Sequence, residues 1–311
     1  EPKLSSVRPV TRNVPATIPS TTSIEVMAMA DAKSKKIAGM IGFTLIKATI
    51  AVVMFLPIIW ILTGGFKTVA EFTTSGSVLP QNPTLKNFQY IFYHSNILGY
   101  TRNTVILMLG TTIGTLLSSA LVAYPLARME FRGKKLVFSI IVATMLIPNI
   151  ALIIPQYIMF GKIGWLDSLL PMIVPSWFAY PYNVFMMRQF FRTIPRELDE
   201  AAEIDGCSSL GILFRILVPI SRPTFVTIGV LSCVFWWNEL TQPVFYINSD
   251  TWRTLTIALM TSFMYTASNT FVISWPTIMA AATLMILPPM LLYLFGSKYL
   301  IGGIKTGGLK G

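Results

Sequence analysis

A carboxylate and two carboxamides stand close together within an apolar part of the sequence, at Glu239, Asn238 and Gln242, beside Trp237. In a continuous helix, positions 238, 239 and 242 would share one face. Pro243 would also leave the carbonyl of Glu239 without its helical donor, which adds a further acceptor to that face. Such a cluster can form hydrogen bonds to a polar solute or hold water, but it contains no nucleophile paired with a base.

Three further residues combine aromatic or amide chemistry with a position inside an apolar stretch. Counting about 1.5 Å per residue along a helix, Asn149, Trp177 and Tyr180 would lie near the middle of a membrane, whereas Glu239 would lie in its outer half. Aromatic faces beside hydrogen-bonding groups suit sugars, although ordinary helix packing uses the same combination, so both interpretations stay open. The candidates for contact with a solute are Asn149, Trp177, Tyr180, Trp237, Asn238, Glu239 and Gln242.

Catalytic and metal motifs are missing from the sequence. His94 is the single histidine, and neither an HExxH nor a CxxC motif is present. The phosphate-binding pattern GxxxxGK[ST] fails at Gly133, because Lys135 stands where that pattern requires serine or threonine. Cys207 and Cys233 are isolated, and no disulfide is expected. We therefore predict no catalytic residue, metal site or cofactor on this chain, so that any ATP with its Mg²⁺ binds another subunit.

Charge is concentrated in one segment, residues 197–223. Five of the 13 acidic residues fall within nine positions there, which predicts that the segment lies in water. Leu198, Ala201 and Ala202 follow helical spacing and would form a small apolar strip on an acidic helix. A solvated helical hairpin and a docking surface for another protein both fit this pattern.

Local signals define the ends of two short helices in this segment. Gly206 should end the first helix in a left-handed or tight conformation. Ser208 is a suitable N-cap for a second helix through Phe214. Pro219 and Pro223 should stop that helix before the next apolar stretch begins.

The elements that must position these residues are membrane-spanning helices. The chain is 53% hydrophobic and 12% charged over 311 residues, with a mean hydropathy of +0.64, which is typical of a polytopic membrane protein. We predict an all-α polytopic fold with six transmembrane helices and a cytoplasmic loop at 188–222, in one domain over residues 36–311. Apolar stretches of about 20 residues, enough to span a bilayer, lie at 37–62, 104–127, 136–160, 168–187, 224–247 and 276–295.

Residues 1–35 are predicted to form a flexible cytoplasmic tail. The first thirty residues are rich in proline, serine and threonine and cannot bury enough apolar surface to fold alone. A charged region followed by a short apolar stretch and a cleavage site is missing, so no signal peptide is predicted. Whether residues 1–30 are native or a leader stays open, because Met27 and Met29 are alternative starting points.

Basic residues define the predicted orientation, because lysine and arginine are favoured in cytoplasmic loops. They cluster in the N-terminal tail, in the loop at 128–135, in the loop at 188–222 and in the C-terminal tail. Both termini and the charged loop are therefore placed in the cytoplasm. The formal net charge of +11 then follows from topology and anionic lipid, and no basic groove with interleaved aromatic residues indicates nucleic acid.

The charged segment resembles the EAA loop of ABC importer permeases, the cytoplasmic loop that docks on an ATPase subunit. Val218 stands where that family usually has leucine. Four other segments resemble the carbohydrate-type, maltose-transporter-like permeases, namely 82–88, 127–134, 237–239 and the glycine-rich basic tail 302–311. The resemblance covers about residues 37–311. The residues that carry it in the loop are Glu200, Ala201, Ala202, Gly206, Ile216 and Pro219.

This resemblance implies a division of labour between several chains. A substrate-binding protein delivers the solute outside, two permease subunits form the solute pathway, and two ATPase subunits bind ATP with Mg²⁺ and drive alternating access. Residues 200–206 would form the coupling helix, seated in a cleft of the ATPase, with Ile216 and Pro219 completing the coupling set. The implied location is the cytoplasmic membrane of a bacterium or archaeon.

Three alternatives stay open from the residues alone. An ion-coupled secondary transporter could use a membrane-embedded acid such as Glu239, but it would have no need of an acidic coupling helix. An intramembrane enzyme would need a catalytic set that the sequence lacks. An ABC permease for a non-carbohydrate solute would share the loop, whereas the tail and residues 237–239 resemble the carbohydrate type. Whether the solute is a sugar, a polyol or a sugar phosphate is not defined by these residues.

Overall fold

The computed structural model describes residues 21–261 and 274–307, with side chains for 39–261 and 274–297. Every regular element within these ranges is helical, and no strand occurs in them. This confirms the predicted all-α class. The chain divides into two compact units, residues 1–58 and residues 59–311, which are described separately.

A single long helix, α1 (Thr21–Gly64), makes up the described part of the first unit and continues into the second. Its apolar part, Gly39–Gly64, has a mean hydropathy of 2.4, in agreement with the span predicted at 37–62. The helix begins at Thr21, however, within the segment predicted to be a tail. Alanine and methionine are frequent from 27 to 32 and are good helix formers, and extending an existing helix needs no new nucleus.

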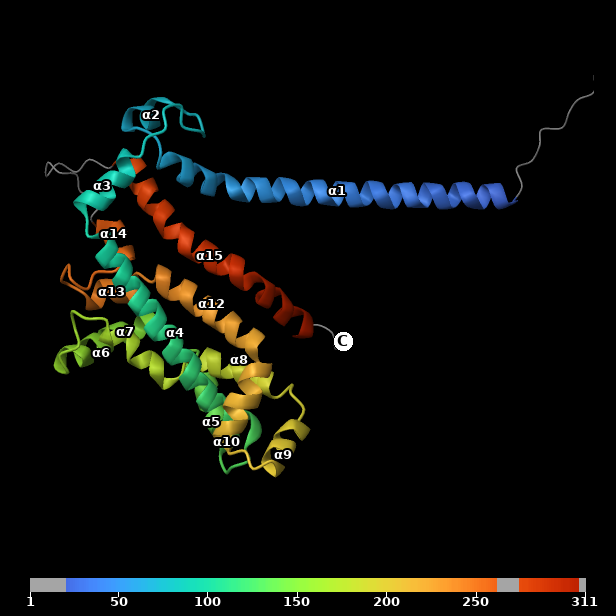
Figure 1. Ribbon diagram of the computed structural model, residues 1–311, viewed down its shortest axis with the longest axis vertical. Coiled ribbons are helices and arrows are strands. Elements are labelled where there is room, and N and C mark those ends of the chain that lie inside the picture. Colours follow the sequence, from blue (N-terminus) through green and yellow to red (C-terminus); the bar gives the residue numbers. More distant parts are fainter. Residues whose placement is uncertain (1–20, 262–273, 308–311) are drawn as a thin grey trace, which may run out of the picture. The chain divides into compact units, whose positions relative to one another are not determined.

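The second unit is built around α4 (Ile97–Arg128). This helix packs against α8 (Pro181–Phe191) and α12 (Arg222–Asn238), and α12 also packs against α15 (Trp275–Gly307) (Figure 1). Small side chains on α4 allow this close approach, since Ala120 and Ala123 are buried in the same core cluster as Val184 and Met187. A long apolar helix therefore supplies one rigid wall of the unit.

Short helices gather at the two ends of α4 (Figure 1). Those at or near its C-terminal end are α5 (Lys134–Thr144), α9 (Glu197–Ile204), α10 (Ser209–Ile212), η2 (Leu213–Leu217) and α11 (Val218–Ile220). Those toward its N-terminal end are α2 (Val69–Thr74), α3 (Lys86–His94), α13 (Thr241–Tyr246) and α14 (Leu255–Thr261). The remaining elements are α6 (Asn149–Lys162), α7 (Leu170–Ile173) and η1 (Pro175–Phe178).

The third and fourth predicted spans are not continuous helices. The stretch predicted at 136–160 divides into α5 and α6, which meet at 93°. Pro148 precedes α6, where it lacks an N–H and disfavours the helical conformation of the residue before it. The stretch predicted at 168–187 divides into α7, η1 and α8, each with a proline in its first two positions.

The fifth predicted span, 224–247, is also broken. Helix α12 ends at Asn238, the backbone of Glu239 is extended, and α13 begins at Thr241. In the described ranges, three helices are long and apolar enough to cross a membrane, or up to five if each sharply bent pair counts as one span. The number of six transmembrane helices therefore stays a prediction.

Candidate functional site

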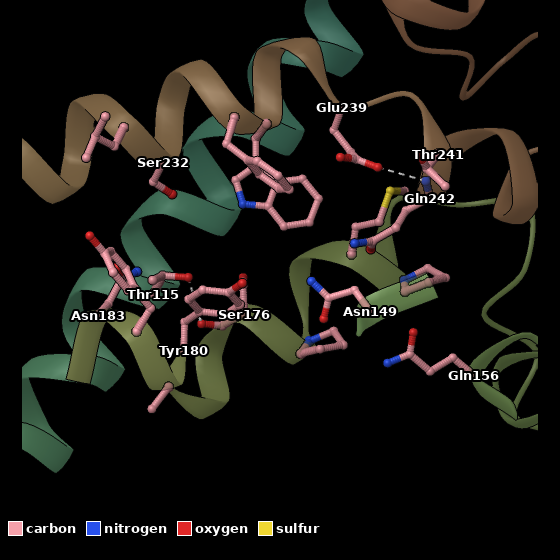
Figure 2. Close-up of a pocket in the computed structure, with 18 of the residues that line it drawn as sticks. Thr115, Asn149, Gln156, Ser176, Tyr180, Asn183, Ser232, Glu239, Thr241 and Gln242 are labelled. Atoms are coloured by element: carbon pink, nitrogen blue, oxygen red, sulfur yellow. Dashed lines mark hydrogen bonds between the residues drawn. The ribbon is translucent and has the colours of Figure 1, made fainter. Parts of the chain in front are cut away.

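A cavity of about 600 Å³ lies where the broken helices meet beside α4 and α12. It is lined by apolar side chains, aromatic side chains, uncharged hydrogen-bonding groups and one carboxylate, that of Glu239 (Figure 2). Its polar and aromatic lining residues are Thr115, Asn149, Gln156, Ser176, Tyr180, Tyr182, Asn183, Ser232, Phe235, Trp236, Glu239, Thr241 and Gln242. A volume of this size is typical of small-molecule sites.

One wall of the cavity is the irregular backbone between η1 and α8. Ala179 has a φ of 64°, a left-handed conformation that costs energy for any residue except glycine. Its N–H donates to Ser118 Oγ (3.0 Å), and the N–H of Tyr180 donates to Ser119 Oγ (3.2 Å). Thr115 Oγ1 on the same helix donates to the carbonyl of Ser176 (3.2 Å). Hydroxyls of α4 thus satisfy the backbone groups that the broken helix leaves free.

Trp177, a predicted solute contact, packs against α4 and is not among the cavity-lining residues. A Cβ atom added at Gly114 would stand 2.4 Å from Trp177 Cδ1. Glycine at this position therefore allows the indole to lie directly on the α4 backbone. The side chain is half exposed, and its predicted role in solute contact stays a prediction.

The opposite wall contains the break at Glu239. The Glu239 carboxylate turns back and its Oε1 accepts a hydrogen bond from the N–H of Gln242 (2.9 Å). The sequence predicts that residues 238, 239 and 242 share one face of a continuous helix. This prediction is wrong, because the helix is interrupted between Asn238 and Thr241. Pro243 lies at the third position of α13, where its missing N–H would have no helical acceptor in any case.

Side chains from the two broken helices face one another across the cavity. Figure 2 shows Glu239 and Gln242 on one side, with Asn149 and Gln156 of α6 opposite. The fully buried Tyr246 donates from its hydroxyl to Gln156 Oε1 (3.1 Å), which orients that amide. Among the described residues that line the cavity, Glu239 carries the only carboxylate, and none is lysine, arginine or histidine.

Two other predicted solute contacts lie outside the cavity lining. Trp237 is 3% exposed and donates from Nε1 to the carbonyl of Met285 (3.0 Å), so it packs in the core beside α15. The Asn238 amide is exposed and donates to the carbonyl of Val234 (2.8 Å) in its own helix. The cavity thus brings together four of the seven candidates, Asn149, Tyr180, Glu239 and Gln242.

Sequence reasoning did not select Thr115, Gln156, Ser176, Asn183 and Ser232, which also line the cavity. A signal for the first of these was available. Thr111, Thr115, Ser118 and Ser119 recur at helical spacing along α4, and a row of hydroxyls in an apolar helix indicates a polar partner on that face. The other four have no comparable local pattern.

The predicted coupling segment forms the short helix α9 followed by a tight turn. Gly206 has a φ of 78°, its N–H donates to the carbonyl of Glu203 (3.0 Å), and the N–H of Cys207 donates to that of Ala202 (2.9 Å). These are the two hydrogen bonds of a Schellman motif. The predicted left-handed end of the helix at Gly206 is therefore confirmed.

The second helix of the segment begins as predicted and continues further. Ser208 is its N-cap, and its Oγ accepts from the N–H of Gly211 (3.2 Å). The helical path does not end at Phe214 but runs through η2 and α11 to Ile220, then bends by 80° into α12. A π-type turn at η2 absorbs one extra residue in this path.

The predicted coupling residues are distributed over two faces of α9 and the turn after it. Glu200, Ala201 and Gly206 are exposed, whereas Ala202 is 6% exposed and packs into the core cluster of α4 and α8. The apolar strip of Leu198, Ala201 and Ala202 is therefore divided, because Ala202 faces its own chain. Further along, Pro219 is exposed and Ile216 is partly buried against the same cluster.

Residues 115–305 match the family described as the inner membrane component of binding-protein-dependent transport systems. The chain belongs to this family. That membership confirms the resemblance carried by the sequence and the multi-pass inner-membrane location, and it favours an ABC permease over an ion-coupled transporter or an intramembrane enzyme. No group of three or more histidine, cysteine or acidic side chains in the described residues is arranged to hold a metal ion.

Several relatives of this inner membrane component are sugar import permeases. The chain is 32% identical to the melibiose/raffinose/stachyose import permease MelC of Bacillus subtilis, over 92% of this chain and 100% of that protein. It is 33% identical to the sulfoquinovosyl glycerol transport permease SmoH of Agrobacterium fabrum, over 82% of this chain and 88% of that protein.

The fold of this inner membrane component also occurs in a solved transporter. A chain of a bacterial ABC transporter involved in import of the acidic polysaccharide alginate aligns with a TM-score of 0.76 and 21% identity, over 86% of this chain and 97% of that one. A second structure, of the alginate transporter with its pentasaccharide-bound periplasmic protein, aligns with a TM-score of 0.61. The overall fold of this chain therefore occurs in a solved ABC transporter.

Proposed function

We propose that this inner membrane component is one permease subunit of an ATP-driven importer for a neutral sugar or oligosaccharide, and that the cavity is its part of the solute pathway. The observation that carries this proposal is the composition of the cavity, in which amides, hydroxyls and aromatic rings surround a space of about 600 Å³. Aromatic faces support the apolar side of a sugar ring, and amides bond its hydroxyls.

Charge narrows the solute class. The cavity residues include one carboxylate, at Glu239, and no cationic side chain among those described. An acidic sugar would meet like charge there without a compensating cation, which is unfavourable. The proposal therefore favours solutes like those in the name of MelC over solutes like alginate.

The proposal includes partners that act on the exposed face of α9. Glu200, Ala201 and Gly206 would contact an ATPase subunit that binds ATP and Mg²⁺, with a second ATPase, a second permease and a substrate-binding protein completing the importer. The family description and the binding-protein-bound alginate transporter support this arrangement. Exposed acidic side chains around the exposed Leu198 and Ala201 fit a docking surface.

Both termini and α9 would then lie in the cytoplasm, and the loop after α13 would lie outside. Single cysteines at Ser208 and Asn248, which are both exposed, test this orientation. An impermeant thiol reagent added to intact cells should label the cysteine at 248 and leave the cysteine at 208 unlabelled. Labelling of both positions from outside would contradict the orientation.

Glu239 provides the test of the cavity. In the reconstituted importer, Glu239→Ala should lose uptake of a radiolabelled neutral oligosaccharide such as raffinose while it still assembles and hydrolyses ATP. Glu239→Gln should retain part of the uptake, because it keeps the size and most of the hydrogen bonding. Asn238→Ala is the matched control, since this neighbour bonds to its own helix and lies outside the cavity lining.

The measurement is uptake per assembled transporter, tested with a panel of neutral and acidic sugars. Wild-type uptake per complex in Glu239→Ala would remove the cavity from the solute pathway. A purified complex without an ATPase subunit, or uptake driven by an ion gradient alone, would contradict the importer itself.

A further inference from the structure

A buried ion pair joins the coupling helix α9 to the end of α4. Arg128 is the last residue of α4, and its Nε lies 3.2 Å from Asp199 Oδ2 on α9. The two side chains are only 4% and 16% exposed. Breaking an ion pair that is this strongly buried costs more free energy than breaking one on the surface, because the remaining buried charge has no compensation.

Asp199 lies on the inward face of α9 together with Ala202, three residues further along the helix. The partly buried Asp199 and the buried Ala202 both face their own chain, whereas Glu200 and Ala201 are exposed. The helix therefore has one face available to a partner protein and one face fastened to the permease. When a partner protein on the exposed face displaces α9, the displacement therefore reaches the permease through the face that carries Asp199 and Ala202.

The end of α4 contacts both parts of the coupling segment. Tyr124, one turn before Arg128, is buried in the same core cluster as Ile212 of α10. Arg128 and Tyr124 stand four residues apart and so lie on the same side of α4. These two side chains fasten α9 and α10 to one helical turn.

The ion pair is held by charge more than by hydrogen bonds. Arg128 Nη2 and Asp199 Oδ1 are buried without a hydrogen-bond partner in the described structure. Charge attraction declines slowly with distance, whereas a hydrogen bond weakens steeply when its geometry changes. The pair can therefore keep α9 attached to α4 while the two helices shift slightly.

Helix α4 connects this pair to the cavity wall. From Arg128 the helix runs unbroken to Ser119, Ser118 and Thr115, a distance of about 20 Å at 1.5 Å per residue. The hydroxyls of these residues hold the irregular backbone at Ser176, Ala179 and Tyr180, which forms part of the cavity. A movement of the end of α4 is thus transmitted to the site through direct hydrogen bonds.

Building on the proposed function, we propose that Arg128 and Asp199 are the positioning pair that transmits movement of α9 through α4 to the solute cavity. The pair contacts neither solute nor nucleotide. Its role is to keep the coupling helix attached to α4, so that a displacement of α9 reaches the cavity wall. Loss of the pair should therefore separate ATP hydrolysis from transport.

The experiment uses the complete importer with its binding protein in proteoliposomes. Asp199→Asn removes one charge at constant size, and Arg128→Met with Asp199→Leu replaces the pair by apolar side chains. Both should assemble and hydrolyse ATP, while uptake of raffinose, or of whichever panel sugar the wild type takes up, per ATP hydrolysed falls about tenfold, a typical coupling between sites. The matched control is Glu130→Gln with Arg196→Gln, an exposed pair in the same region.

Each outcome has one meaning. A wild-type ratio of uptake to hydrolysis in both variants would overturn the role of the pair and leave the proposed function intact. Failure of both variants to assemble would show a purely structural pair and would also overturn it. A wild-type complex that takes up no sugar would overturn the proposed function together with this inference. An equal fall in the exposed-pair control would show that charge in the region, and not this pair, controls coupling.

Discussion

The two ends of α4 are held by different kinds of contact. At the N-terminal end, Asn103 Nδ2 donates to the carbonyls of Thr251 (2.8 Å) and Arg253 (3.0 Å), and Thr104 Oγ1 accepts from the N–H of Leu255 (2.9 Å). These partners are neutral, and the two side chains of α4 are each 1% exposed. At the C-terminal end, a single hydrogen bond from Arg188 Nε to the carbonyl of Leu126 (3.0 Å) is joined by a buried ion pair with unused hydrogen-bonding atoms.

This difference indicates which end is fixed and which can shift. Two amide hydrogen bonds from one side chain define both distance and direction, so the N-terminal end has a single geometry. The ion pair defines mainly distance, because its Coulomb attraction has little directional preference. We infer that the N-terminal end of α4 is a fixed platform and that its C-terminal end is a movable link.

The largest loss of stability is expected at the fixed platform, the N-terminal end of α4. Asn103→Leu removes the two hydrogen bonds that the buried Asn103 amide donates to the carbonyls of Thr251 and Arg253, at a cost of about 2–3 kcal/mol in stability. The thermal unfolding temperature of the purified complex should fall accordingly. Asn238→Leu is the control, because that amide is exposed and bonds within its own helix. Equal unfolding temperatures for the two variants would remove the idea of a fixed platform.

A smaller loss of stability is expected at Gly206, in the turn directly after α9, the helix that the movable link holds. Its φ of 78° is strained for any side chain, although an added Cβ would meet nothing within 4 Å. Gly206→Val should therefore cost about 1–2 kcal/mol of local stability through backbone strain alone. Gly206→Asn should cost less, because asparagine tolerates the left-handed region.

Co-purification of the ATPase subunit measures this effect. Valine should weaken the association while membrane insertion stays normal, and asparagine should largely retain it. A Gly206→Val permease that binds its ATPase as strongly as the wild type would show that the turn geometry does not matter for docking.

The turn at Gly206 and the break at Ala179 differ in how well the sequence predicts them. The left-handed end at Gly206 and the cap at Ser208 depend on neighbours in the chain, and both predictions are confirmed. The break at Ala179 depends on hydroxyls of Ser118 and Ser119, about sixty positions away. Sequence periodicity carries no information about such a distant partner, so a span at 168–187 was predicted without the position of its break.

The candidate site shows the same limit. The candidates were chosen for hydrogen-bonding and aromatic side chains, and four of them, Asn149, Tyr180, Glu239 and Gln242, line one cavity. Trp237 lies in the last turn of α12, before the extended Glu239, and packs against α15 in the core. Its burial depends on a contact with Met285, 48 positions away, which local sequence does not show, and the solute-binding role of the four cavity residues stays a prediction.

A pH effect is expected in the loops at the platform end. Hydrogen bonds from the backbone N–H of Ser249 (2.7 Å) and Asn248 (3.0 Å) hold the pKa of Asp167 below its ordinary value. The lowered pKa means that the carboxylate stabilises the folded loop at pH values above the ordinary pKa of about 4. That contribution is lost as the pH falls from there through the lowered pKa.

Amide hydrogen exchange measures this loss. Exchange at Ser249 and Asn248, corrected for the intrinsic rate, should become faster on acidification in the wild type. Asp167→Asn should make it almost independent of pH, while asparagine still tolerates the φ of 59° at this position. A wild-type loop whose protection is unchanged on acidification would show that the carboxylate does not hold the two segments together.

The smallest effect is expected at the exposed ion pair beside the movable link. Arg196 Nη2 lies 3.5 Å from Glu130 Oε1, with side chains 59% and 74% exposed, and Glu130 also contacts Lys134. Water and salt screen such a pair, and two long side chains lose freedom when they form it. Arg196→Gln should therefore leave the unfolding temperature and the ratio of uptake to hydrolysis unchanged, in low and in high salt. If Arg196→Gln reduced this ratio as much as Asp199→Asn, burial would not be what distinguishes the two pairs, and the link would extend over the whole charged end of α4.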